Sequence, residues 1–91
     1  MSAYIDHAKS GPGILIVYGR GTPGYRIDLH KDDTGEILGN IDVDSQGTYQ
    51  INTEEKIIRT FKGQTIRIRV RETIDNSNYS YWSVPSEVHI F

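Results

Sequence analysis

The feature that most constrains the fold is a run of strict alternation between aliphatic and charged residues at positions 66–71, IRIRVR. In a β-strand, successive side chains point to opposite faces. Ile66, Ile68 and Val70 would therefore share one face, and the three arginines between them the other. A helical period would mix the two sets around one cylinder. The run predicts a strand with one face in an aliphatic core and the other toward water.

A second alternating run covers residues 25–30 and predicts a partner strand. Its expected inward residues are Tyr25, Ile27 and Leu29, and its expected outward residues are Arg26, Asp28 and His30. We expect Asp28 to pair with one of the arginines of the neighbouring strand, since opposite charges on adjacent strands attract. The two runs together predict one sheet face that is aliphatic and one that carries ions.

Further strands are predicted by apolar runs between turn residues. The run at 14–18 is apolar throughout and predicts a central strand with both faces covered. The remaining expected elements are an edge strand at 3–7, strands at 36–43 and 48–51, hairpin loops at 31–35 and 44–47, a crossover loop at 52–62 anchored by Phe61 or by Ile57 and Ile58, and a last strand over 79–83 and 87–91 broken at Pro85.

Length and composition favour a single all-β domain. A chain of 91 residues closes one core, so we expect one domain over residues 1–91. Alanine occurs only at Ala3 and Ala8, which argues against helices. The fold class that we predict is an antiparallel β-sandwich of about seven strands.

Charge and cysteine content exclude several classes of partner. The formal net charge is −2 and the chain has no cysteine, so we expect neither nucleic-acid binding nor thiolate metal sites. Absence of cysteine leaves the redox compartment open. No apolar run is long enough to span a bilayer, and residues 1–9 lack the apolar core of a signal peptide. We expect no membrane insertion, and either a domain of a longer exported protein or a small complete one.

Two motifs carry a resemblance to known families. The turn GRGTPG at 19–24, the strand after it and the segment DSQGTY at 44–49 resemble bacterial immunoglobulin-like domains, which carry G-x-G-x-P-G and D-x-x-G-x-[WY] patterns. Residues 69–88 are similar to the closing strands of fibronectin type III modules. The resemblance implies an immunoglobulin-like sandwich and a role at a surface or in an assembly.

The function implied by this resemblance is a non-catalytic binding or structural module. Such modules serve bacterial surface proteins, adhesins and phage virions as spacers, decorations or presenters of partners, which places the chain outside the cell, on its surface or in a virion. The expected partners are a protein, a cell-surface glycan, neighbouring domains of a longer chain, or a capsid. Fold alone does not fix function.

Arg67, Arg69 and Arg71 form the first candidate site, because three guanidinium groups in a row can hold phosphate or an acidic glycan. The alternative is structural. The segment WSVPS at 82–86 resembles a degenerate form of the W-S-x-W-S motif of cytokine receptors, in which arginines interleave with tryptophan. We favour such an interleaved arrangement with Trp82, because a guanidinium on an indole contributes about 0.5–1 kcal/mol at an exposed site.

Tyr79, Tyr81 and Trp82 form the second candidate site. Exposed aromatic rings bind sugar rings or proteins, so the alternative function is a carbohydrate-binding module, with Tyr25 or Tyr49 as further contributors. We favour the structural alternative, in which these rings pack in the core or stack on the arginines.

Catalysis and metal binding have little support in the sequence. Residues 42–47 match the start of an EF-hand loop, but the acid at its twelfth position is missing, and a β-turn is the better interpretation. His7, His30 and His89 lie far apart, and no nucleophile motif is present. We therefore expect no catalytic residue, metal ion or cofactor.

Overall fold

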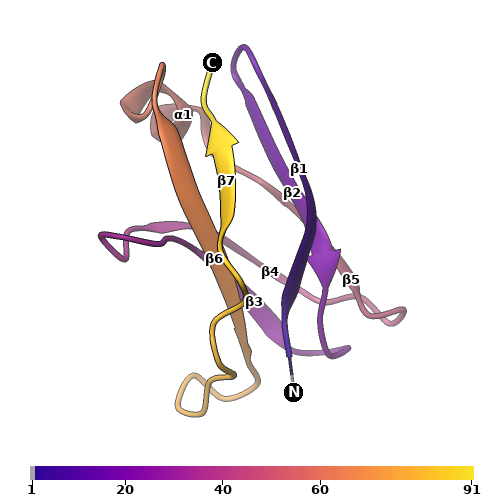
Figure 1. The fold of residues 1–91 in the computed structure, drawn as a ribbon. Helices are drawn as coiled ribbons and strands as arrows, with labels where there is room; N and C mark the ends of the chain where they lie inside the picture. The colour runs from indigo at the N-terminus through magenta and orange to yellow at the C-terminus, as the bar shows by residue number, and fades with distance from the viewer. Residues whose placement is uncertain (1) are drawn as a thin grey trace.

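The computed structural model describes residues 2–91, which form seven strands and one short helix (Figure 1). The elements in chain order are β1 (Tyr4–Gly11), β2 (Ile14–Arg20), β3 (Arg26–Lys31), β4 (Ile37–Asp42), β5 (Thr48–Asn52), α1 (Glu55–Thr60), β6 (Thr65–Thr73) and β7 (Ser86–His89).

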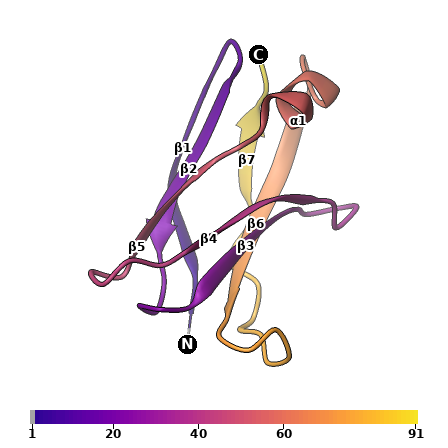
Figure 2. The same cartoon turned by 180° about the vertical axis from the view of Figure 1, so that it is seen from behind.

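The strands form two antiparallel sheets that face each other. One sheet has the order β1-β2-β5 and the other the order β4-β3-β6-β7. Figures 1 and 2 show the two sheets as layers, with α1 at the same end of the molecule as the C-terminus. The all-β antiparallel sandwich predicted from the alternating runs is confirmed.

The core lies between the two inner sheet faces, as the alternation predicts. Ile27 and Leu29 of β3 and Ile68 and Val70 of β6 have no exposed surface. Tyr25, which precedes β3, is only half-buried. The two central strands of the larger sheet therefore supply the middle of the core, and the same alternation sends the arginines of β6 to its outer face.

One prediction for β2 is wrong. β2 is central in its sheet, but only the side chains of its inner face, such as Leu15 and Val17, are fully buried. On its outer face Ile14 is 43% exposed, and Ile16 and Tyr18 are half-buried. The reason is that, within residues 2–91, no third layer covers the outside of the three-stranded sheet. A run of apolar residues therefore does not by itself imply two buried faces.

The predicted second hairpin at 44–47 is also corrected. This turn joins β4 to β5, which belong to different sheets, so it is an arch between the layers. Asp44 holds the arch, because its carboxylate accepts hydrogen bonds from the backbone N–H of Thr48 at 2.9 Å and of Gln46 at 3.0 Å. The bonds from Thr48 lower the pKa of Asp44. The sequence predicts the position of the turn correctly. It does not predict that β4 pairs with β3 while β5 pairs with β2.

The crossover predicted at 52–62 is confirmed. It contains α1 and carries the chain from β5 of one sheet to β6 of the other. Ile58 and Phe61 are buried, and Ile57 packs against the core from a partly exposed position.

The last predicted strand is shorter than expected. Regular pairing with β6 begins only at Ser86, and residues 79–85 contribute one isolated bridge, between Tyr79 and Thr73. Here two serine hydroxyls replace the missing ladder bonds. Ser80 Oγ accepts the N–H of Glu72 at 2.9 Å, and Ser83 Oγ accepts the N–H of Val70 at 3.0 Å. Each serine N–H donates in return to the carbonyl of the same residue.

We predict that Gly19→Ala destabilises the domain strongly. A Cβ at Gly19 would overlap the carbonyl oxygen of Tyr4 and the hydroxyl of Tyr49, which donates to that carbonyl at 2.8 Å. Overpacking of this kind costs about 1–3 kcal/mol, which lowers Tm by about 10 °C in a domain of this size. Gly11→Ala is the control, because a Cβ there meets nothing within 4 Å. Equal melting temperatures for the two variants would contradict this packing.

Candidate functional site

The outer face of β6 carries a stack of alternating cations and rings, which we call the arginine–aromatic ladder: Arg69, Trp82, Arg71 and Tyr79. The guanidinium carbon of Arg69 lies 4.0 Å from the centre of the Trp82 ring, and that of Arg71 lies 4.4 Å from it. Arg71 also lies 3.8 Å from the centre of the Tyr79 ring. All of these distances are within the range of cation–π attraction.

Local sequence explains why the ladder forms. Alternation along β6 places every second residue on the outer face. The paired bonds of Ser80 and Ser83 fix residues 79–83 alongside β6. Trp82 is thereby held over the arginines. Tyr81 takes no part in the ladder and is 97% exposed.

The ladder is flanked by ion pairs that involve other residues than expected. Asp32 lies 3.4 Å from Arg69 and 4.0 Å from Arg67. Asp28 lies opposite Arg71 in the strand register, but it pairs at 2.9 Å with Arg26 of its own strand, and not with an arginine of β6 as predicted. Arg67 is exposed and lies outside the ladder. Of the three arginines in the row, Arg69 and Arg71 are therefore stacked on rings, and Arg67 faces solvent.

His30 of β3 closes one side of the ladder. Its ring centre lies 4.8 Å from that of Trp82. Burial, followed by the positive charge of Arg71, lowers the pKa of His30, against an opposing effect of Asp28. In the part of the chain that the structure describes, the buried Nε atoms of Arg69 and Arg71 have no hydrogen-bond acceptor. Arg71 therefore interacts with the rings of Trp82 and Tyr79, whereas Arg69 interacts with the ring of Trp82 and also with Asp32.

A buried carboxylate at Glu72 was missed by the sequence reasoning. Glu72 has no exposed surface, and it accepts hydrogen bonds from the N–H of Thr22 at 2.8 Å and from its hydroxyl at 2.6 Å. The signal was present, because position 72 continues the inward series of 66, 68 and 70. Glu72 ties the loop between β2 and β3 to the end of β6.

The metal-ligating residue types are not clustered in the described part of the chain. No group of three or more His, Cys, Asp or Glu residues within 2–91 is placed to hold a metal ion. The three histidines lie on three different strands, β1, β3 and β7. Residues 42–47 form the arch described above. No helix within this part of the chain is both long and apolar enough to cross a membrane.

The predicted sugar-binding rings have different surroundings in the structure. Tyr79 and Trp82 each have a guanidinium over the ring, and Tyr49 is buried in the core. Tyr81 and Trp82 both border a groove of about 280 Å³ that also includes Tyr4, Asp6, Arg20 and Val84. Tyr4 gave no signal in the sequence, since its nearness to Tyr81 depends on how the two sheets are stacked.

Comparison with known proteins adds no assignment: no protein-family model matches the sequence, and the search of curated proteins finds no significantly similar one.

We predict that Trp82→Ala lowers the free energy of unfolding by about 2 kcal/mol, because it removes the ring shared by two partly buried guanidinium groups. Such a loss corresponds to a decrease in Tm of about 10 °C. Tyr81→Ala is the matched control on the neighbouring residue, and it should change Tm little because its side chain is exposed. Thermal unfolding followed by circular dichroism measures both. An unchanged Tm in Trp82→Ala would show that the ladder does not stabilise the fold.

We also predict that His30 makes stability depend on pH. Its pKa is lower in the folded chain than the value of 6.5 expected when unfolded, so between these two values the unfolded chain binds more protons. Stability should therefore fall as the pH is lowered from about 7.5 to about 5.5. Urea unfolding of His30→Gln should show a smaller decrease than the wild type. Tyr81→Ala, whose side chain is exposed, is the control and should keep the wild-type decrease. An equal pH dependence of the unfolding free energy in all three proteins would refute the assignment.

Proposed function

We propose that the chain is an immunoglobulin-like module, similar to fibronectin type III modules, with a non-catalytic binding or structural role in a bacterial surface protein, an adhesin or a phage virion. The fold supports this proposal, because a three-stranded sheet packed on a four-stranded sheet in the order given above is the arrangement expected of such modules. The sequence motifs at 19–24 and 44–49 point to the same class.

The observation that carries a structural role is the direction of the first and last strands. β1 enters the sandwich at one end, and β7 leaves it at the opposite end (Figures 1 and 2). The longest extent of the domain is 34 Å. Domains with this geometry can be joined in line, so each copy or neighbour would lengthen the assembly. This is the property required of a spacer.

The engagement of the polar side chains supports the same proposal. Arg69 and Arg71 are occupied by aromatic rings, and Glu72 is occupied by Thr22. These contacts stabilise the sandwich. The module would therefore act through its surface and through its links to neighbouring domains.

A tandem protein of two directly joined copies tests the spacer role. Small-angle X-ray scattering should give a maximum dimension of about twice that of the single domain, because in-line joining adds one long axis. Thermal unfolding should give the same Tm for the tandem as for the single domain. A maximum dimension close to that of one domain, or a loss of folding in the tandem, would contradict the proposal.

Carbohydrate binding is the second candidate function. One observation favours it: the ring of Tyr81 is almost wholly exposed, although aromatic side chains are normally buried to a large degree. Its neighbours on the same segment are anchored to β6, so the ring is presented on a fixed backbone.

A further inference from the structure

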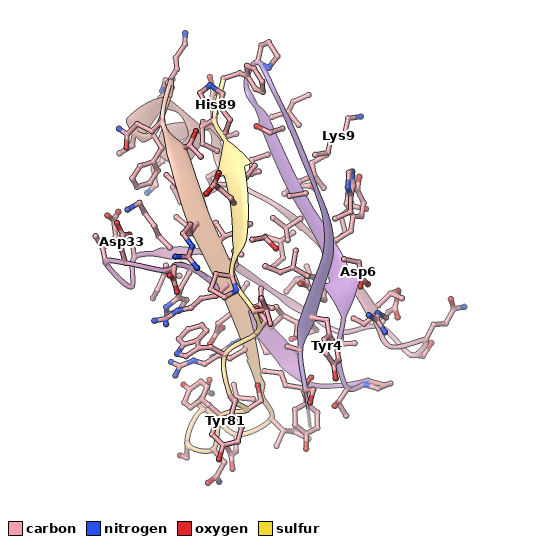
Figure 3. All side chains as sticks on the ribbon, viewed as in Figure 1. Tyr4, Asp6, Lys9, Asp33, Tyr81 and His89 are labelled. Carbon is pink, nitrogen blue, oxygen red and sulfur yellow. The ribbon has the colours of Figure 1, made fainter. Side chains whose placement is uncertain are left out.

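The groove beside Tyr81 crosses the boundary between the two sheets. One wall comes from β1 and the end of β2, and the other from residues 81–84, which precede β7. Figure 3 shows Tyr4 and Tyr81 near one end of the sandwich, with Asp6 further along β1. β1 is an edge strand of its sheet, and the segment 81–84 leads into β7, an edge strand of the other sheet.

The groove has apolar surfaces that are open to solvent. Tyr81 is 97% exposed, Val84 is 85% exposed and Tyr4 is 48% exposed. Val84 follows Ser83, whose hydrogen bonds to Val70 fix this part of the chain. The backbone that carries Tyr81 and Val84 is therefore held in place before any ligand binds, which reduces the entropy that binding would lose.

The groove also has a preorganised polar wall. Arg20 forms a two-pronged pair with Asp6, in which Nε donates to Oδ2 at 2.9 Å and the terminal nitrogen donates to Oδ1 at 2.8 Å. The Arg20 guanidinium lies 4.9 Å from the centre of the Tyr4 ring, which orients it further. Both side chains keep substantial exposure, so their remaining donors and acceptors face solvent. The two charges cancel, so the wall favours a neutral ligand with paired hydroxyl groups.

We infer that this groove is a binding site for a neutral saccharide, which would stack the C–H face of a sugar ring on Tyr81 and hydrogen-bond its hydroxyls to Asp6 and Arg20. This inference deepens the proposed role as a binding module and rests on it. The size of the groove favours a short sugar segment over a protein. Ten residues line the groove, whereas each side of a standard protein interface uses roughly 20–30.

Titration of the ¹⁵N-labelled domain with neutral oligosaccharides tests the inference. The probes are tetrasaccharides of β-1,4-glucose, β-1,4-mannose, β-1,4-xylose and α-1,4-glucose, with tetragalacturonate as the acidic comparison, each at up to about 10 mM, which detects dissociation constants in the millimolar range. We expect at least one neutral probe to give saturable shifts at Tyr4, Arg20 and residues 81–84. Tyr81→Ala should weaken its binding about tenfold, the loss of about 1.4 kcal/mol that ring stacking can supply.

Phe91→Ala is the matched control, because Phe91 is an exposed aromatic residue outside the groove. It should bind the probe as the wild type does. The inference is overturned if no neutral probe shifts the groove resonances, if only the acidic probe binds, or if Tyr81→Ala binds with unchanged affinity and an unchanged folded spectrum. A negative result here with an extended tandem protein would refute the saccharide site and leave the spacer role intact.

Discussion

Strand β6 sets the constraint on which the rest of the structure depends. It lies between β3 and β7 in the larger sheet, and its two faces have opposite chemistry. The inner face supplies Ile66, Ile68 and Val70 to the core. Since a shift of one residue would exchange the faces, burial of these aliphatic residues fixes the register of β6 against both neighbours.

The outer face of β6 would be a row of like charges without further contacts. The ring of Trp82, from the segment that follows β6, lies against the guanidinium groups of both Arg69 and Arg71. This arrangement needs the segment to stay close to β6 although Pro85 interrupts regular pairing. Ser80 and Ser83 meet that need with their hydroxyls. The same anchoring leaves Tyr81 pointing away, so one short segment provides both a structural ring and an exposed one.

Much of the fold could be predicted because alternation is a local signal. Residues 25–30 and 66–71 identified the two central strands, and the turn residues identified the breaks between strands. The sequence could not predict that β4 and β5 belong to different sheets, since the turn at Asp44 is compatible with a hairpin and with an arch between sheets. The partial exposure of Ile14 and Ile16 could not be predicted either, because it depends on whether a third layer covers the three-stranded sheet.

The candidate sites show the same division. The stacking of Trp82 on arginines was a hypothesis from residue types and from the degenerate W-S-x-W-S motif, and the geometry agrees with it. The partner of Asp28 was not predictable, since Arg26 on the same strand competes with Arg71 on the next. The groove joins Tyr4, Asp6 and Arg20 of the three-stranded sheet to Tyr81, which precedes β7 of the other sheet. Such a site depends on how the sheets stack, and no local pattern encodes it.

The ring current of Trp82 offers the most direct test of the central claim that β6 is stabilised by stacking on its outer face. Proton NMR should place the side-chain methylene signals of Arg69 and Arg71 upfield of those of Arg67, which lies outside the ladder, and Trp82→Phe should change these shifts selectively. Methylene signals of all three arginines at the positions of an exposed arginine would contradict the account.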